Sequence, residues 1–462
     1  MIPIANGRFY PERLVFVPSS LGDDRLGDVF ARYPVLDDDA ENRKTLFAHH
    51  PHHTPVRPEL LTKLGFSLSR NCNLRCQYCS ACSSEGYGTA VSQEDVLALV
   101  SDVMKRWTIA HLLSPSESGR LELYFTGGGE PTYDWEAFCG LILAIEDKAR
   151  RNEIPLQLGI TTNGVLDDAK ADFLAEHFQR IMVSYDGCPD IQNRNRKSPH
   201  YSETSPLVER CLQRLCAKSS PLTVRTTVWP DDFHRLREMA DFLFGTLGCR
   251  FTWSILPVSP MGRAATKCAD YEADADNAAY DFLKAYLDIC QYAGERWGDA
   301  KVETQFFPIS PAHLFCGSLA YAAQCAWLMS NGDIVTCVEA DQFPTVLGHV
   351  KDGAVEYHSE CEDLLLEKAQ QLFDSCKWCF AYPFCKGGCP AKAIARERAR
   401  ITEGMPWDCR MTVKFWKYLL TGVLEGKEVW GWRAEPSKFE ELRDAGVLEF
   451  VRPSERNEDL LK

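Results

Sequence analysis

Apolar residues recur along the chain in short continuous runs, and stretches with helical periodicity separate them. Continuous apolar runs are typical of strands that are covered on both faces. Six of them lie between residues 64 and 256: LGFSLS (64–69), LELYFTG (121–127), LQLGITT (156–162), RIMVSYD (180–186), LTVRTTV (222–228) and RFTWSIL (250–256).

The intervening stretches predict helices. Ser92 and Asp95 form a capping-box pattern ahead of an apolar stripe that ends near Trp107. A second stripe begins at Trp135, and further helices are expected over 166–178, 205–218, 231–247 and 269–295. Six alternating strand–helix units predict an α/β fold in which a parallel sheet curls into a partial or complete barrel. The active site of such a sheet lies at the carboxyl ends of its strands.

Composition narrows the class of protein. The 462 residues, 45% hydrophobic and 25% charged, suit a globular protein of two or three domains. No apolar run approaches the roughly 18 residues of a membrane span, and the N-terminus lacks the apolar segment of a secretion signal. We therefore expect a cytoplasmic protein without a membrane partner. A net charge of −14 argues against a nucleic-acid partner.

Residues 1–60 differ from the rest, because prolines punctuate them and an acidic run, DDDAEN, crosses them. His49, His50, His52 and His53 offer metal ligands, but Pro51 separates the two pairs and helical spacing is lacking. A solvated loop is the interpretation that this pattern favours, and the segment has no role that we can name.

The chain has 20 cysteines, too many for an ordinary cytoplasmic enzyme. Disulfides are one alternative, but a reducing compartment favours metal-bound thiolates for the clustered cysteines. Isolated cysteines are expected to be small buried hydrophobes, and these are Cys139, Cys188, Cys211, Cys216, Cys249, Cys268, Cys290 and Cys361.

The first cysteine group follows the first predicted strand, in SRNCNLRCQYCSAC. Cys72, Cys76 and Cys79 have the spacing C-x3-C-x2-C, and three thiolates leave one iron of an iron–sulfur cluster open to a small molecule. Cys82 could be a fourth ligand, and a zinc site could use the same elements. The second strand ends in FTGGGEP, which argues for the iron–sulfur interpretation. Its glycines allow close approach to a ligand, and its glutamate can bind an ammonium group.

The cysteine loop together with GGGEP resembles the radical S-adenosylmethionine (SAM) superfamily. The resemblance implies that Cys72, Cys76 and Cys79 bind a [4Fe-4S] cluster whose open iron is chelated by SAM. Reductive cleavage of SAM then yields a 5′-deoxyadenosyl radical that abstracts a substrate hydrogen. Cys82 falls outside the family pattern and is expected not to be a ligand.

The same resemblance implies a set of SAM contacts. Glu130 would hold the SAM amino group, beside Gly127, Gly128 and Gly129. The VSYDG and IQNRNR segments resemble a family element whose serine and arginine reach the ribose and carboxylate. The implied further contacts are Tyr78 near the adenine, Thr162 and Asn163 at the third strand end, Ser184, Arg196, and Leu256 beside the adenine.

Cysteines become dense again after residue 300. Cys316 precedes a G-x4-C motif at 332–337, a C-x2-C-x5-C-x3-C run at 376–389 and Cys409. The array resembles the SPASM extension of radical SAM enzymes that modify peptides and proteins. It implies two auxiliary [4Fe-4S] clusters, one bound by Cys316, Cys325, Cys337 and Cys389 and one by Cys376, Cys379, Cys385 and Cys409. Structural zinc is the alternative, and Cys325 has the least family-like spacing.

The expected fold is thus a partial (β/α)6 radical SAM barrel followed by a small cysteine-rich SPASM domain. The expected divisions are an N-terminal segment (1–60), the barrel (61–300), the auxiliary-cluster domain (301–410) and a helical extension (411–462). The resemblance covers roughly residues 62–410. Gly262, in the GRA that follows the last strand, is expected to turn the chain without a chemical role.

We expect a radical SAM maturase that abstracts a hydrogen from a ribosomally made peptide and forms an oxidised or cross-linked product. One alternative is an anaerobic sulfatase maturase that makes formylglycine; a non-radical electron-transfer or zinc-scaffold protein is another. Sulfatase maturases have an aspartate after the cysteine of the G-x4-C motif as a proposed base, and Val338 followed by Glu339 stands here. Glu339 is the candidate acid or base. A peptide or protein substrate and a reductant such as flavodoxin or ferredoxin are the expected partners.

Overall fold

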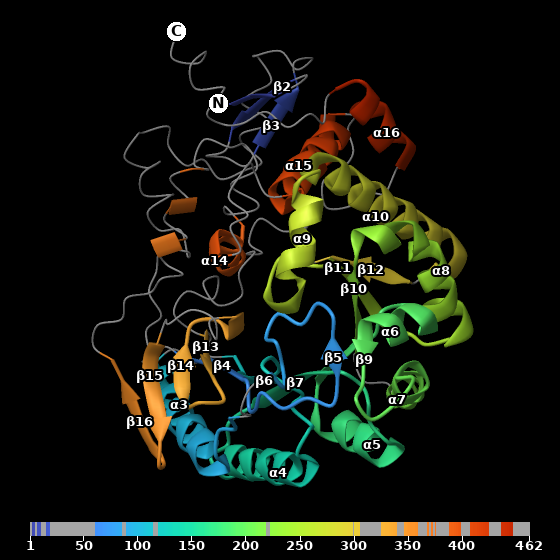
Figure 1. Cartoon of the computed structure of the whole chain (residues 1–462). Coiled ribbons are helices and arrows are strands. Elements are labelled where there is room, and N and C mark those ends of the chain that lie inside the picture. The colour runs from blue at the N-terminus through green and yellow to red at the C-terminus, as the bar shows by residue number, and fades with distance from the viewer. Residues whose placement is uncertain are drawn as a thin grey trace.

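The structure is a computed structural model of the whole chain (Figure 1). It describes residues 2–4, 7–10, 15–18, 61–85, 89–113, 119–218, 222–298, 300–304, 325–339, 346–358, 367–368, 371–372, 375, 388–398, 407–424 and 436–446. The histidine cluster and Cys361 lie outside these residues, as do Cys316, Cys376, Cys379 and Cys385.

The six predicted strands form the parallel core of one sheet and lie side by side in chain order. The prediction of an α/β barrel sheet is confirmed. The observed strands begin and end within a few residues of the predicted ones. The strands are β4 (Lys63–Phe66), β6 (Leu121–Phe125), β7 (Leu156–Thr162), β8 (Arg180–Ser184), β10 (Leu222–Val228) and β11 (Thr252–Pro257).

Helices pack around this sheet (Figure 1). They are α3 (Gln93–Leu113), α4 (Trp135–Arg151), α5 (Asp168–His177), α6 (Pro189–Asn195), α7 (Ser205–Ala217), α8 (Leu236–Ala240), α9 (Ala265–Glu272) and α10 (Ala275–Trp297). Ser92 accepts the backbone N–H of Asp95 at 3.0 Å and donates to its carboxylate at 2.7 Å, as the capping box predicts.

Two predicted helices are interrupted. The helix expected over 231–247 is a 3-10 turn, η5 (Pro230–Arg235), followed by α8 and a π-helical segment, η6 (Asp241–Thr246). Pro230 sits in the first turn of η5, where its missing N–H costs no hydrogen bond. The helix expected over 269–295 divides into α9 and α10, with Asp274 as the N-cap residue of α10.

Sequence analysis missed the strands that extend the sheet at both ends. β12 (Lys301–Glu303) pairs with β11, and β13 (Cys325–Leu328) pairs with β4, both in parallel. β14 (Asp333–Val335), β15 (Val346–Lys351) and β16 (Ala354–Tyr357) continue from β13 in antiparallel order. The sheet therefore crosses the domain boundary expected at residue 300, and that division remains a prediction.

Large and small residues alternate across the inner face of the barrel. Trp327, Gly65, Tyr124 and Gly159 are partners in register on four neighbouring strands. A Cβ atom on Gly65 would collide with the Trp327 ring, and one on Gly159 would collide with the Tyr124 ring. The glycines thus make room for the two rings inside the barrel, as a tapering barrel interior requires.

Small elements from the two ends of the chain lie near the barrel. β1 (Ile2–Ile4), β2 (Gly7–Tyr10) and β3 (Val15–Pro18) form a separate antiparallel sheet. The C-terminal helices are α14 (Pro390–Arg398), α15 (Trp407–Leu424) and α16 (Pro436–Asp444). Helix α15 packs on α10 (Figure 1), where the buried Lys414 donates to Asp276 at 2.7 Å. Because α15 already includes Cys409, the extension expected from residue 411 begins inside a helix.

In the part of the chain that the structure describes, none of the helices combines the length and apolar composition needed to cross a membrane.

Gly65→Ala should destabilise the protein by about 1–3 kcal/mol, because the added methyl group displaces the Trp327 ring and strains the β4–β13 pairing. The measurement is the thermal unfolding midpoint of anaerobically prepared protein. Gly294→Ala is the matched control: nothing lies within 4 Å of its Cβ position inside α10, so this change should stabilise by about 0.5–1 kcal/mol. An unchanged midpoint for Gly65→Ala would contradict the packing of Gly65 against the Trp327 ring.

Candidate active site

The loop that carries Cys72, Cys76 and Cys79 lies at the carboxyl end of β4. Cys76 is in the short strand β5 (Arg75–Cys76), which pairs with β9 (Arg196–Lys197). The structure brings the three thiols together, since Cys76 and Cys79 both raise the pKa of Cys72 through their charges. Cys82 has a positive φ of 48°, and its backbone N–H donates to the Cys79 carbonyl at 3.3 Å.

Burial is the main influence on the pKa values of the Cys72 and Cys76 thiols. It raises the pKa of Cys72 to about 12, and Glu130 adds to that rise. Burial likewise raises the pKa of Cys76 to about 11, although the nearby Arg196 guanidinium lowers it. Thiols in this state are protonated at neutral pH and lose their protons on binding a metal, so metal binding and the folding of the loop are coupled.

The glycine run after β6 packs closely against the cysteine loop. Gly127 and Gly128 have φ values of +73° and +57°, which favour glycine. A Cβ on Gly129 would collide with the backbone carbonyl of Asn71. The Glu130 N–H donates to the same carbonyl at 2.8 Å, so the run and the loop are held in contact.

Glu130 is buried, 5% exposed, and hydrogen bonds hold its carboxylate in place. The hydroxyls of Thr132 and Thr162 each donate to Oε1 at 2.7 Å, and the Asn163 N–H donates to Oε2 at 2.7 Å. Burial raises the pKa of Glu130, and these donors lower it. Asn163 also reaches the cysteine loop, donating from Nδ2 to Asn73 at 2.6 Å. The third strand end therefore meets Glu130 through direct hydrogen bonds, and the predicted contacts of Thr162 and Asn163 with SAM remain a prediction.

A buried network joins Tyr78 to Arg196. The Tyr78 hydroxyl donates to the Asp186 carboxylate at 2.7 Å and accepts from Nη1 of Arg196 at 2.9 Å. Asp186 is fully buried, and burial raises its pKa while Arg196 lowers it. Sequence analysis missed Asp186, although the VSYDG segment contains it. The Tyr78 ring lies 6.5 Å from that of Trp229, at the end of β10.

Polar residues form a row across the inner face of the barrel. Ser184, Arg225, Ser254 and Glu303 are partners in register on four neighbouring strands. Burial lowers the pKa of Arg225, whereas Tyr124, Glu339 and Glu303 raise it. The charge of Glu339 thus acts on Arg225, which lies on the inner face. Leu256 is 8% exposed, pairs with Thr227 and belongs to the hydrophobic core.

These residues fit the cluster and SAM that the cysteine pattern implies. Three thiols from one loop are soft ligands suited to iron. Among the described residues, Arg196 Nε and Trp229 Nε1 are buried without a hydrogen-bond partner, and both side chains lie beside Tyr78. Because buried N–H groups are nearly always hydrogen-bonded, these two donors indicate that a polar ligand binds beside them. Cys72, Cys76 and Cys79 would hold the cluster, and Glu130, Arg196 and the glycine run would face the cofactor.

The described C-terminal cysteines lie in three places. Cys337 and Cys389 pack against one small hydrophobic cluster that includes Val335 and Ile394. Cys325 is buried in β13, and Cys409 is in the first turn of α15. The isolated Cys188, Cys211, Cys249 and Cys268 are buried, as expected, whereas Cys139, Cys216 and Cys290 are partly buried.

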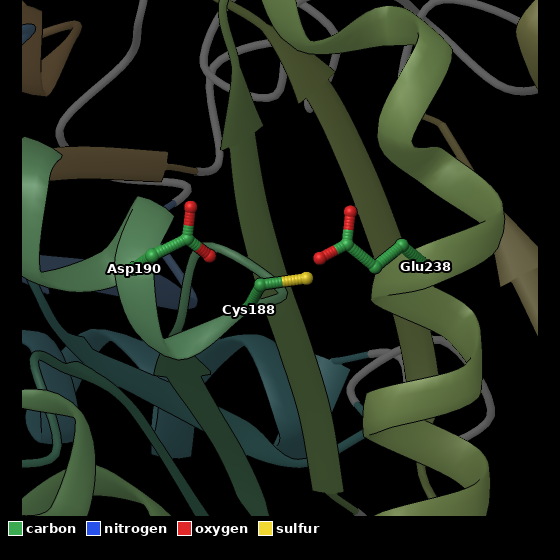
Figure 2. A group of neighbouring side chains, drawn as sticks. All are labelled: Cys188, Asp190 and Glu238. Atoms are coloured by element: carbon green, nitrogen blue, oxygen red, sulfur yellow. The ribbon is translucent and has the colours of Figure 1, made fainter.

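Cys188, Asp190 and Glu238 form a further group of possible metal ligands, with ligand atoms within 4.8 Å of one another. Figure 2 shows the Cys188 sulfur pointing toward the Glu238 carboxylate. Arg235 already binds both carboxylates, with Nη1 2.7 Å from Asp190 and Nη2 2.6 Å from Glu238. Because this guanidinium already binds both carboxylates, we assign no metal to this group.

The barrel, the three-cysteine loop and the glycine run that meets it together define a radical SAM domain. Residues 66–243 match the model of the Radical SAM superfamily, so this part of the chain is a radical SAM domain.

The chain is similar to the cysteine-type anaerobic sulfatase-maturating enzyme of Clostridium perfringens. The two are 22% identical over 362 residues, which cover 76% of this chain and 94% of the relative. The solved structure of native anSMEcpe with bound AdoMet has a TM-score of 0.58 at 19% identity, covering 79% of this chain and 99% of that one. Native anSMEcpe with bound AdoMet and Cp18Cys peptide has a TM-score of 0.56 at 20% identity, covering 79% and 99%. The structural likenesses support the fold.

These comparisons correct our functional prediction. We expected a maturase of ribosomally made peptides that forms cross-links, and this main interpretation is wrong. The similarity to sulfatase-maturating enzymes spans nearly the whole of those relatives, and it favours the formylglycine alternative. The residue after Cys337 had argued for the cross-linking interpretation, but one position weighs less than similarity along most of the chain.

Glu130→Gln should weaken SAM binding about tenfold or more while the iron content stays unchanged. A carboxylate bond to an ammonium contributes about 1.5–3 kcal/mol, and glutamine also places an NH2 group against the donors of Thr132, Thr162 or Asn163. Equilibrium binding of SAM to anaerobic protein is the measurement. Equal affinity in the two proteins would show that Glu130 does not contact SAM.

Proposed function

We propose that this chain is an anaerobic sulfatase maturase that oxidises a cysteine of a sulfatase to formylglycine. The observation that carries the proposal is the similarity to cysteine-type anaerobic sulfatase-maturating enzymes, over 94% of their length. The substrate partner is then a protein, presented as an extended segment. A solved structure similar in fold holds AdoMet together with the Cp18Cys peptide, which supports a peptide-sized substrate at this kind of site.

The reaction removes two electrons from the target cysteine. A hydrogen atom leaves Cβ, the thiol loses a proton and one more electron, and water then replaces the sulfur, which departs as hydrogen sulfide. The bound cluster and SAM supply the hydrogen-abstracting radical. The chain holds the cluster with Cys72, Cys76 and Cys79 and keeps the site buried. It must also receive one proton and one electron.

Two auxiliary clusters are the proposed acceptors of that electron. One would be bound by Cys316, Cys325, Cys337 and Cys389, and the other by Cys376, Cys379, Cys385 and Cys409, as a SPASM-type domain over residues 301–410. The packing of Cys337 and Cys389 against one hydrophobic cluster supports their assignment to a common site. A flavodoxin or ferredoxin is the proposed reductant.

Glu339 is the proposed proton acceptor. Val338 lies on Gly127, where a Cβ would collide with its side chain, so the segment after Cys337 reaches the glycine run. Glu339 follows at once, and its charge acts on Arg225 at the inner face of the barrel. A carboxylate one residue later along the chain can therefore take the place of the aspartate that directly follows the motif cysteine in sulfatase maturases.

The test incubates the anaerobic holoenzyme with SAM, a strong reductant and a sulfatase peptide that contains the target cysteine. We expect an aldehyde at that residue, trapped by a hydrazide probe and located by mass spectrometry, with loss of the sulfur. A product that loses two hydrogens but retains the sulfur would contradict the proposal. So would an unchanged peptide accompanied by 5′-deoxyadenosine.

Glu339→Gln should reduce aldehyde formation about 100-fold or more, because a general base contributes at least that factor. Formation of 5′-deoxyadenosine should continue, since SAM cleavage does not need this carboxylate. Val338→Asp in the Glu339→Gln background is the matched variant, and it should recover part of the aldehyde yield. Full activity in Glu339→Gln would remove Glu339 from the reaction.

A further inference from the structure

Four consecutive residues after β11 lie where three parts of the molecule meet. Met261 packs into the hydrophobic cluster that Cys337 and Cys389 flank. Gly262, Arg263 and Ala264 form the 3-10 turn η7 (Gly262–Ala264). Ala264 packs in the small cluster of Trp229 and Val258, against which the Tyr78 ring lies. The segment thus touches the C-terminal cysteine region on one side and the neighbourhood of Tyr78 on the other.

Arg263 binds the loop of Cys72, Cys76 and Cys79 through several hydrogen bonds. Its backbone N–H donates to the Cys79 carbonyl at 3.1 Å. Its guanidinium donates to the Cys76 carbonyl at 3.1 Å and to the Ser83 carbonyl at 2.6 Å. The remaining donor, Nε, forms an ion pair with Glu85. The backbone and the 17% exposed side chain of this one residue therefore tie together four positions of a loop that is about 180 residues away in sequence.

Gly262 allows this close approach. A Cβ at this position would collide with the carbonyl oxygens of Cys79 and Ser80, and φ is +54°, a value that favours glycine. The glycine therefore turns the chain, as expected. It also brings the Arg263 backbone against the cysteine loop, which the sequence interpretation did not foresee.

The Arg263 guanidinium also brings positive charge to the ligands. The Cys79 and Cys82 thiols both interact with it electrostatically, and Arg196 interacts with Cys76 in the same way. Iron–sulfur clusters bound by thiolates gain negative charge on reduction, and nearby cations and hydrogen bonds influence their potential. A cation held beside Cys79 favours the reduced form.

We propose that Arg263 is a positioning residue that fastens the cysteine loop to the last strand of the barrel, and thereby slows iron loss and raises the reduction potential of the SAM-binding cluster. The hydrogen bonds of the guanidinium keep the loop in place, and its positive charge raises the reduction potential of the cluster. The proposal rests on the radical SAM class of the chain and not on the identity of the substrate.

Two substitutions separate the two effects. Arg263→Gln removes the charge and most of the donors, so the SAM-binding cluster should lose iron to a chelator about tenfold faster, with a lower midpoint potential. Arg263→Lys keeps the charge but replaces the fork with a single ammonium group. It should keep a midpoint potential near that of the wild type and still lose iron faster. The readouts are the decay of the SAM-dependent part of the electron paramagnetic resonance spectrum and a redox titration of the same signal.

Two matched variants control for indirect effects. Glu85→Gln leaves the three carbonyl contacts of Arg263 intact and should change both readouts little. Arg210→Gln removes a 70% exposed arginine paired with Asp168, far from the loop, and should change neither. Thermal unfolding of each holoprotein shows whether it is folded.

Folded Arg263→Gln protein with wild-type iron retention and potential would overturn the proposal. A potential lowered equally in the lysine and glutamine variants would overturn the assignment of the charge effect. If Arg263→Gln fails to fold, Arg263→Lys decides, since the proposal requires faster iron loss there as well. None of these outcomes depends on a peptide substrate, so they stand apart from the test for formylglycine.

Discussion

The central constraint on this protein is that three mutually close thiols must be held, partly buried, at the open end of the barrel. Burial raises the pKa of Cys72 to about 12, which means that the burial of an ionised thiol is unfavourable. The loop therefore does not bring these thiols together by itself. Contacts from distant parts of the chain hold it. The glycine run after β6 packs against Asn71, strand β9 pairs with Cys76, and Arg263 binds three loop carbonyls. The glycine run, strand β9 and Arg263 thus all stabilise the position of the cysteine loop.

The same contacts connect the cofactor site with the barrel interior. Glu130 bridges the glycine run and the end of β7 through Thr162 and Asn163. Val338 lies on Gly127, so the segment after Cys337 joins the site from the C-terminal part of the chain. Because β13 also pairs with β4, the cysteine-rich region continues the sheet of the barrel. Strand β13 and Val338 thus connect the C-terminal part of the chain with the barrel and the glycine run.

The sequence predicted the barrel strands well, since continuous apolar runs such as 156–162 and 222–228 have no other good explanation in an α/β chain. It could not predict the contact of Arg263 with the loop or the buried Asp186, because these depend on register between distant segments. Sequence analysis did not predict strand β13. The Trp327 ring fits in this strand because Gly65 lies opposite it, and that pairing is not visible in the sequence. The functional prediction failed because it relied on one position, the residue after Cys337, where Val338 stands in place of the aspartate of sulfatase maturases.

The most direct measurement concerns the loop itself. If the chain binds the two proposed auxiliary clusters, we expect about twelve irons in the intact protein. Replacing Cys72, Cys76 and Cys79 with alanine should then leave about eight irons per chain and abolish 5′-deoxyadenosine formation under strong reductant. Circular dichroism must show that the variant is folded, since cluster loss and unfolding are coupled. A folded triple variant that still cleaves SAM would contradict the assignment of this loop as the radical-generating site, and with it the role of the surrounding contacts in holding a SAM-binding cluster.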